Sequence, residues 1–417
     1  MNFIRFITGG IKIIFNGSKT YYTWLIILLL LILWGGSGYS GQIVHGLIKT
    51  HMRDSVSWGF YIGNFTFLVG VAAAAVMLVI PAYIYDWKPI KEIAIFGELL
   101  AVCSVIMCLS FIIVDIGNPL RFWHMLPLIG TLNFPSSMLS WDFFVLNIYL
   151  ILNLVVVTYL LYCIFYKKEY NKSFVLPLVL FSIPMAVAIH TTTAFLYNAL
   201  PGRVFWNSAL LAPRFLASAF CSGPAILLIL FQILRKTTRF EIKDEAIWKI
   251  AELMVYAMFI YLFFTIAELF KEFYSGTENI LYWKYLLFGI GDHKEIVPYS
   301  WSSIIMGCIA FVLFLIPKTR KNFLTLNIGA VLIYGSVYVE KGIALIIPAF
   351  TPDVLGQIYV YTPSMTEIKT AVMIFSIGFL LFTFLSKIAI AIVFEDYNID
   401  SLNPRKKAAQ IGAASDH

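Results

Sequence analysis

Five polar side chains interrupt apolar stretches of the sequence, where they could do chemistry: Asn64, Asp115, Asp142, His190 and Arg214. An ionisable group deep in a bilayer costs at least about 2.5–3.5 kcal/mol, so it needs a partner, a wet cavity or a function. A helical rise of about 1.5 Å per residue places all five toward the same end of their stretches. We therefore expect them to form one polar layer.

This predicted layer has the groups that the head group of a quinone needs. A quinone ring takes a hydrogen-bonding partner at each carbonyl, a proton donor or acceptor, and an apolar groove for its tail. Histidine exchanges protons near neutral pH, and a carboxylate can orient it or pass the proton on. We predict His190 and Asp115 as catalytic residues and all five as quinone ligands. The alternative is that Asp115, Arg121 and Arg214 form interfacial ion pairs that fix the loops, and that His190 packs in the core.

Acidic residues at two depths suggest a path for protons. Glu98 and Glu252 lie toward the opposite end from the layer, whereas Glu268 and Glu340 lie toward it. A chain of carboxylates could carry protons between the two ends. For Glu98 and Glu252 we favour a simpler interpretation, in which they cap helix N-termini and face headgroup water.

The cysteines and histidines do not predict a bound redox centre. The five cysteines fall in apolar segments without CxxC spacing. Haem ligation by two histidines needs two membrane histidines on facing helices, and only His190 lies well inside an apolar stretch. We therefore expect no haem, iron–sulfur cluster or metal in this chain.

The composition places these residues in a membrane. Of 417 residues, 60% are hydrophobic and 13% charged, which excludes a soluble globular enzyme. The apolar runs are too long for the alternating strands of an outer-membrane barrel. At about 20 residues per span, we predict an all-α integral membrane protein with about ten transmembrane helices. Their ranges are 22–43, 58–84, 93–116, 138–166, 174–198, 213–234, 250–271, 299–317, 323–350 and 365–393. We expect the first to be a retained span, not a signal peptide, because it is long enough to cross.

Basic residues predict how the chain is oriented. Lys and Arg are more than twice as frequent in the segments on the side of both termini as in those on the other side. The positive-inside rule therefore predicts a multi-pass protein of the cytoplasmic membrane with both termini cytoplasmic. The net charge of +7 is explained by this topology, so we expect a lipid bilayer and no nucleic acid as partner. The outer connections are long and poor in basic charge, which favours them as the functional side.

An internal repeat divides the chain. Gly97-Glu98-Leu99-Leu100 in span three resembles Ala251-Glu252-Leu253-Met254 in span seven, and Ser140-Trp141 resembles Ser300-Trp301. An even number of spans per copy predicts two parallel four-helix bundles with one flanking helix at each end. The predicted divisions are 1–57, with a basic start, the first helix and an outer loop; a first bundle 58–198 that holds the quinone site; a second bundle 199–350; a last helix 351–394; and a cytoplasmic tail 395–417.

Several motifs resemble the NrfD/PsrC family of quinone-interacting membrane subunits, which includes the polysulfide reductase type. The likeness covers about 40 to 390, and within the family it is closest to the DsrP branch, then to HmcC. The segments that carry it are Trp58-Gly59-Phe60-Tyr61 with Asn64, Asp115-Ile116-Gly117-Asn118-Pro119, Asn133-Phe134-Pro135, His190-Thr191-Thr192 and Arg214-Phe215-Leu216-Ala217.

This resemblance implies a membrane subunit without a redox centre of its own. It would exchange electrons between menaquinone and a ferredoxin-like iron–sulfur subunit on the outer face. In the DsrMKJOP complex of sulfur-metabolising microbes, a c-type cytochrome and further membrane and cytoplasmic redox subunits complete the path. The family's quinone pocket falls here on Asn64, Asp115 and His190, with Arg214 near it. Some relatives have a histidine in the helix where this chain has only Asn64.

Two other functions remain open at the level of sequence. A secondary transporter could use repeated bundles with buried carboxylates, although the repeat is parallel and the ionisable groups lie near the helix ends. A structural anchor would hold an electron-transfer module against the membrane, with His190 a packing residue. As a quinone-interacting subunit of a multisubunit oxidoreductase, the chain would not be an enzyme alone.

Overall fold

The fold is almost entirely helical, as the sequence predicts. The computed structural model describes residues 2–127, 129–238, 242–277, 279–353 and 355–393, and within them there is no β-strand. Ten of its helices are long and apolar enough to cross a membrane, which confirms an all-α integral membrane protein. The predicted tail 395–417 lies outside the described residues.

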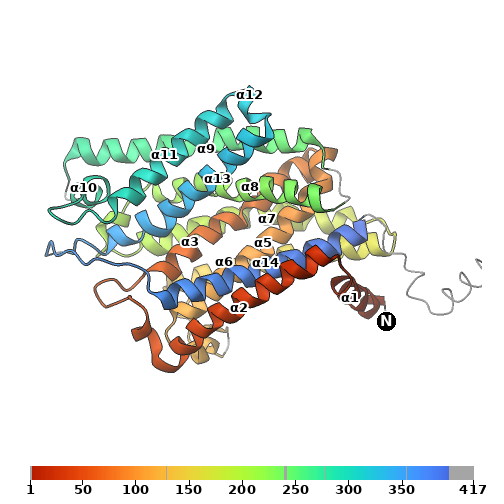
Figure 1. Ribbon diagram of the computed structural model, residues 1–417, viewed down its shortest axis with the longest axis horizontal. Coiled ribbons are helices and arrows are strands. Elements are labelled where there is room, and N and C mark those ends of the chain that lie inside the picture. Colours follow the sequence, from red (N-terminus) through yellow and green to blue (C-terminus); the bar gives the residue numbers. More distant parts are fainter. Residues whose placement is uncertain (1, 128, 239–241, 278, 354, 394–417) are drawn as a thin grey trace, which may run out of the picture.

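The helices alternate in direction along the long axis of the molecule (Figure 1). The long helices are α2 Lys19–His45, α3 Phe60–Ala72, α5 Lys88–Asp115, α6 Met138–Phe165, α7 Lys172–Asn198, α8 Leu211–Thr237, α9 Asp244–Ser275, α11 Val297–Leu315, α13 Phe323–Val339 and α14 Met365–Val393. The short helices are α1 Asn2–Ile14, α4 Ala74–Val79, α10 Ile280–Phe288 and α12 Pro317–Arg320. Short 3-10 helices are η1 Gly46–Lys49, η3 Pro119–Met125, η4 Val204–Trp206 and η6 Ile347–Ala349, and two π-helices are η2 Ile80–Ile84 and η5 Glu340–Ala344.

Two groups of four spans pack side by side. α3 with α4, α5, α6 and α7 form one group, and α8, α9, α11 and α13 form the other. The groups meet where α8 packs on α3, α4 and α7, and where η5 packs on α3. The predicted boundaries between the units stay predictions, but this packing is what a repeated four-helix unit requires.

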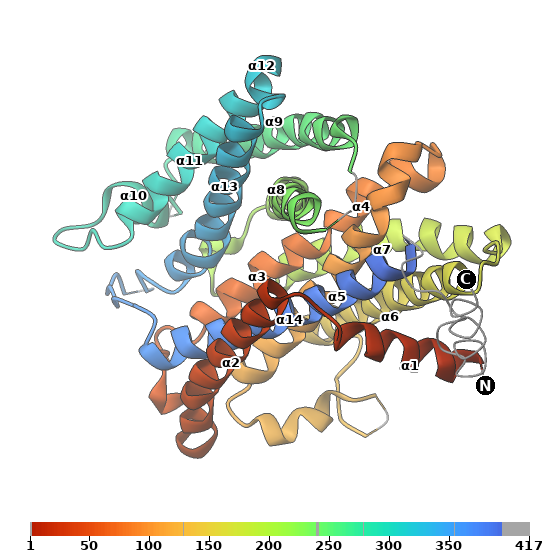
Figure 2. The same ribbon diagram turned by 45° about the vertical axis from the view of Figure 1, so that its right-hand side comes forward.

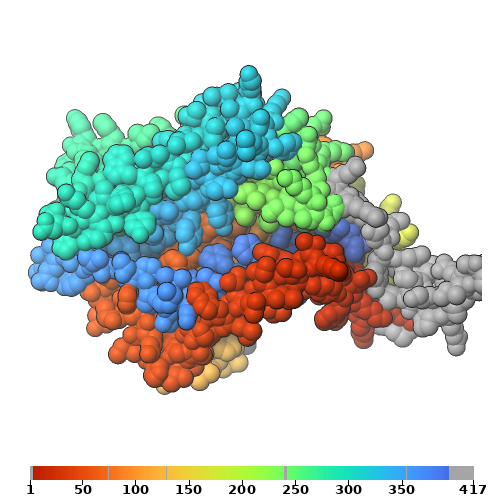
Figure 3. Space-filling model, viewed as in Figure 1, coloured from red at the N-terminus to blue at the C-terminus, as the bar shows by residue number. Residues whose placement is uncertain are grey.

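The first and last spans, predicted as flanking helices, pack against each other. α2 and α14 lie side by side, with α14 also against α5 (Figure 2). In the space-filling view they form one half of the visible face, and the second group of spans forms the other (Figure 3). Gly35 and Gly38 make the close approach possible, because an added Cβ would lie 2.5 Å from the Lys369 carbonyl oxygen and 2.7 Å from the Lys369 Cβ.

Two spans end irregularly. The predicted span 58–84 is divided into α3, α4 and η2, and Pro81 in η2 has no N–H to donate to the helix. The span 323–350 ends in η5. A π-helical turn shifts the following side chains around the helix axis and is frequent at functional sites. In η5 this turn carries Glu340 and Lys341.

An additional helix precedes the first span. Phe6 and Ile13 of α1 are buried, and the Phe6 ring lies 5.7 Å from that of Tyr162 in α6. Elsewhere on its surface Ile4, Ile7 and Ile11 are exposed. Exposed apolar side chains on a short amphipathic helix are typical of a segment that lies in the membrane interface. From the sequence, this segment was expected only to be a basic start.

The long connections 46–59, 116–137, 199–210, 276–296 and 351–364 gather at one end of the molecule, here named the loop-rich end. One buried carboxylate holds two of them: Glu367 accepts hydrogen bonds from the backbone N–H groups of His51 (3.0 Å) and Ser364 (2.8 Å) and from the Tyr361 hydroxyl. Burial, with the nearby Glu367 charge, raises the pKa of Tyr361, so the hydroxyl stays protonated and donates. These connections are the segments that the sequence predicts on the outer side. The predicted outer side of the protein is therefore the loop-rich end.

Candidate functional site

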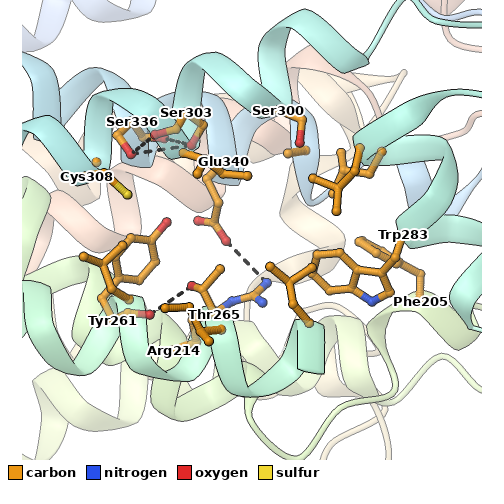
Figure 4. A pocket seen from close by; sticks show the side chains of 18 residues that line it. Phe205, Arg214, Tyr261, Thr265, Trp283, Ser300, Ser303, Cys308, Ser336 and Glu340 are labelled. Atoms are coloured by element: carbon orange, nitrogen blue, oxygen red, sulfur yellow. Dashed lines mark hydrogen bonds and ion pairs between the residues drawn. The ribbon is translucent and has the colours of Figure 1, made fainter. Parts of the chain in front are cut away.

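A cavity of about 120 Å³ lies between the helices of the second group, toward the loop-rich end. Figure 4 shows it from close by. Its walls come from α8, α9, α10, α11, α13 and η5, with η4 beside them. The lining residues are Phe205, Arg214, Tyr261, Leu262, Thr265, Ile266, Leu269, Trp283, Leu286, Leu287, Ser300, Ser303, Ile304, Gly307, Cys308, Ser336, Glu340 and Ala344.

A buried arginine joins two carboxylates at this cavity. Arg214, in the first turn of α8, forms an ion pair with Glu268 of α9, and its other terminal nitrogen lies 3.3 Å from Glu340 of η5. The side chains of Arg214 and Glu268 are almost fully buried. Charges removed from water need such pairing, because each alone would lose its hydration without compensation. Glu340 points into the cavity in Figure 4, and its Oε2 has no hydrogen-bond partner within the described part of the chain.

Aromatic and small polar residues complete the cavity wall. Tyr261 and Trp283 contribute rings, and the Phe205 ring lies 5.4 Å from that of Trp283. On the opposite wall the Ser303 hydroxyl donates to the Ser336 carbonyl oxygen at 2.8 Å, and the Ser336 hydroxyl donates to the Ser303 carbonyl oxygen at 2.7 Å. The serines satisfy each other, so the free polar atoms of the cavity gather at the Arg214 and Glu340 side.

Arg214 is the member of the predicted five-residue layer that lines this cavity. Asn64, Asp115, Asp142 and His190 do not belong to its wall. All five do lie near the loop-rich ends of their helices, as predicted from helical rise. The structure divides them laterally among several local clusters.

Asn64 is bonded across the interface between the two groups of spans. Its amide donates to the Phe60 carbonyl oxygen at 2.7 Å, and its carbonyl oxygen accepts from the Tyr338 hydroxyl at 2.9 Å. Both ends of the side chain therefore have protein partners. Tyr338 belongs to α13, so this contact ties α3 to the second group.

His190 is buried on α7 and faces the same interface. Its Nδ1 lies 2.7 Å from the Ala186 carbonyl oxygen, which favours a proton on Nδ1. The other ring nitrogen, Nε2, has no hydrogen-bond partner within the described residues. Lys341 lies close enough to interact electrostatically with His190, and its Nζ lies 3.1 Å from the centroid of the Phe215 ring. The ring is 1% exposed and also interacts with the backbone of Val69 in α3.

The two predicted aspartates lie on different helices, and Tyr197 lies close enough to both for electrostatic interaction. Asp142 of α6 is fully buried and accepts a hydrogen bond from the Thr193 hydroxyl at 2.7 Å, while its second oxygen has no partner in the described chain. Asp115 ends α5, close enough to Glu367 and Tyr61 for electrostatic interaction. Its cluster is not that of His190, whose Nδ1 is bonded to a backbone carbonyl instead. The predicted role of Asp115 as an orienting carboxylate therefore stays a prediction.

The two inner glutamates have unlike environments. Glu252 is partly exposed and pairs with Lys249 at 3.2 Å. The favoured interpretation of both residues as helix caps is wrong. Glu252 lies about two turns into α9, which begins at Asp244. Glu98 lies about three turns into α5, is buried, and has one oxygen without a partner among the described residues. The reason is that α5 begins at Lys88, well before the predicted span.

Metal-binding side chains do not gather in the described residues, where no group of three or more His, Cys, Asp or Glu is placed to hold an ion. All five cysteines are free thiols.

Comparison with known families decides the classification. The family described as polysulphide reductase NrfD matches residues 49–351. The chain belongs to this NrfD family. The matched range contains both groups of four spans, while α1, α2 and α14 lie outside it.

The NrfD chain is similar to subunits of three named oxidoreductases. A Halobacterium salinarum protein named as a candidate membrane subunit of dimethyl sulfoxide reductase is 25% identical, over 86% of this chain and 88% of the relative. A subunit of the selenate reductase of Mesobacillus selenatarsenatis is 23% identical, over 88% of this chain and 92% of its own. The Hdr-like menaquinol oxidoreductase integral membrane subunit of Archaeoglobus fulgidus is 23% identical, over 91% of this chain and 98% of the relative.

Several residues of the site in this NrfD chain were not predicted from the sequence: Tyr261, Trp283, Tyr338 and the pair Ser303 and Ser336. Each is polar or amphipathic and lies in or beside an apolar stretch, but such residues are common in membrane spans. The signal that could have found the cavity was Glu340-Lys341, two adjacent opposite charges inside a predicted span. Two charges there indicate a buried polar cluster.

Proposed function

We propose that this chain is the membrane subunit of an oxidoreductase complex and exchanges electrons between menaquinone and an iron–sulfur subunit docked at the loop-rich end. One observation carries the proposal. Near that end, four acid–base side chains each keep one buried oxygen or nitrogen atom without a partner in the described chain: Asp115, Asp142, His190 and Glu340. Buried polar atoms are normally hydrogen-bonded, so free ones indicate places for a ligand.

The residues fit what a quinone requires of a protein. Bound quinone supplies two-electron redox chemistry coupled to two protons. His190 Nε2 can give or take a proton at the interface between the two groups of spans, and Asp142 can hold one beside Thr193. Family membership and the relative named as a menaquinol oxidoreductase subunit support menaquinone as the carrier.

The proposed partner surface is the loop-rich end. Its turn η3 exposes Leu120, Phe122 and Trp123, and the Trp123 ring stacks on His124 with centroids 3.8 Å apart. Exposed aromatic and apolar residues on an ordered connection are typical of an interaction surface. We propose the iron–sulfur subunit here. A c-type cytochrome and the DsrP type of complex remain predictions from the resemblance, with HmcC as the alternative.

The proposal is tested in the assembled complex, with menaquinol as donor and reduction of the iron–sulfur subunit as readout. Replacing His190 by Gln removes its acid–base function, so we expect turnover to fall by about 10²-fold or more. The matched control is Thr191→Val, at the next residue, which is half-buried on the same helix and bonds only its own helix backbone at Val187 among the described residues. Unchanged turnover of an intact His190→Gln complex would contradict a catalytic role for His190. Absence of menaquinol-dependent reduction in the unsubstituted complex would contradict the function and favour an anchor.

A further inference from the structure

We propose that the cavity between α8, α9, α11 and η5 binds the ring of a quinone or hydroquinone, with the tail leaving between α9 and α11 into the lipid. The choice of a quinone rests on the proposed function. The location of the site does not rest on the proposed function. The cavity belongs to the second group of spans, whereas the predicted residue His190 belongs to the first.

The size and the walls of the cavity fit one aromatic ring. Its volume of about 120 Å³ is somewhat below the volume of about 150 Å³ of an apolar protein cavity that takes up benzene, so it holds about one ring, and the second ring of a naphthoquinone would lie in the opening. Tyr261, Trp283 and Phe205 offer ring edges and faces on one side. Aromatic rings pack favourably in offset or edge-on contacts with such side chains. A larger head group would extend toward the opening.

The free polar atoms suit both redox forms of the ring. Glu340 Oε2 has no partner within the described residues and points into the cavity, so it can accept a hydrogen bond from a hydroquinone hydroxyl. The Arg214 guanidinium lines the same wall and can donate to a quinone carbonyl. Ser300, at the loop-rich end of the cavity, supplies a further hydroxyl. A neutral ring with oxygens at opposite positions can therefore find a partner in either state.

The cavity opens on the lipid-facing surface. Ile266 of α9 is 64% exposed and Cys308 of α11 is also exposed, yet both line the cavity. A lipid-soluble ligand can thus reach it sideways, without crossing the loops. The charges disfavour a phospholipid headgroup as occupant. Arg214 already faces two carboxylates, Glu268 and Glu340, so a phosphate there would meet a negative or balanced cluster.

The test is photolabelling of the complex in nanodiscs with a photoreactive menaquinone analogue, followed by peptide mapping by mass spectrometry. We expect saturable labelling of the α9 and α11 segments around Thr265 and Cys308. Unlabelled menaquinone should compete, and added phospholipid should not. Cys308→Phe narrows the opening from an exposed position, so we expect labelling there to fall by about tenfold or more, equivalent to about 1.4 kcal/mol.

The matched control is Ile305→Phe, which adds a similar ring to an exposed position of α11 that does not line the cavity. It should label as the unsubstituted protein does. Labelling confined to α3 and α7 and unaffected by Cys308→Phe would overturn this inference and leave the proposed function standing. Competition by phospholipid would overturn it in favour of a lipid site. Absence of saturable labelling in any segment would remove both this inference and the proposed quinone exchange.

Discussion

At the scale of single residues, the balance of buried charge decides which substitutions this chain can tolerate. Arg214, Glu268 and Glu340 come from three helices and compensate one another. Their pairing gives little net stability over an apolar replacement, but removing one partner leaves the others buried without compensation. The same cluster that limits substitution provides the free carboxylate oxygen at the cavity.

Replacing Arg214 by Gln should therefore destabilise the protein strongly. It leaves two carboxylates facing each other in a site of low polarity, and we expect a loss of about 3–5 kcal/mol in the free energy of unfolding. Thermal unfolding of the detergent-solubilised protein measures the change. Arg121→Gln, at an exposed residue of η3, should change stability by no more than about 0.5 kcal/mol.

The double variant Arg214→Gln with Glu268→Gln separates charge from packing. Removing one of the two carboxylates should recover part of the loss, because the remaining repulsion falls. A double variant no more stable than Arg214→Gln alone would show that the arginine acts through its packing and not through its charge.

At the scale of elements, close helix contacts fix the interface that carries His190, Asn64 and η5. Gly63 of α3 faces Gly342 of η5, and a Cβ added at Gly63 would lie 2.4 Å from the Gly342 carbonyl oxygen. The obstacle is backbone, so it cannot move aside as a flexible side chain would. The contact of α3 with η5 therefore requires glycine at this position.

Gly63→Ala should separate α3 from η5 and lower the free energy of unfolding by about 1–3 kcal/mol, the usual effect of overpacking. The matched control is Gly41→Ala in α2, where an added Cβ meets nothing within 4 Å. Alanine favours a helix over glycine, so this variant should be neutral or slightly stabilising. Equal stabilities for the two variants in thermal unfolding would contradict the proposed tight contact.

At the scale of the whole molecule, an even number of spans places the first and the last described helix residues at the same end of the molecule. α1 packs against α14, opposite the loop-rich end. The basic residues predict that this shared end is cytoplasmic. That orientation also decides from which side the iron–sulfur partner would dock.

Single cysteines test the orientation. Asp292→Cys lies in the loop-rich end and Lys168→Cys in the opposite connection, and both residues are exposed. In intact cells a membrane-impermeant maleimide should label position 292 and not 168, and permeabilisation should add labelling at 168. The natural cysteines should not interfere, since four are buried and Cys308 faces lipid within α11. The reverse pattern would invert the topology and move the proposed docking surface to the cytoplasm.

The sequence alone determined the properties that depend on local chain chemistry. Ten apolar stretches were recognisable because each span must be apolar by itself to lie in lipid. The depth of Asn64, Asp142, His190 and Arg214 followed from the helical rise. The motifs around them also placed the chain in its family.

Only the tertiary structure decided which helices face each other. Arg214 meets Glu268, 54 residues away, and Glu340 on a third element, while Asp115 and His190 belong to different clusters. The pairing of α2 with α14, the burial of Glu98 and the cavity of the second group were equally invisible in the sequence. The physical reason is that hydropathy and helical periodicity are local, whereas the lateral order of spans depends on contacts between side chains far apart in the chain.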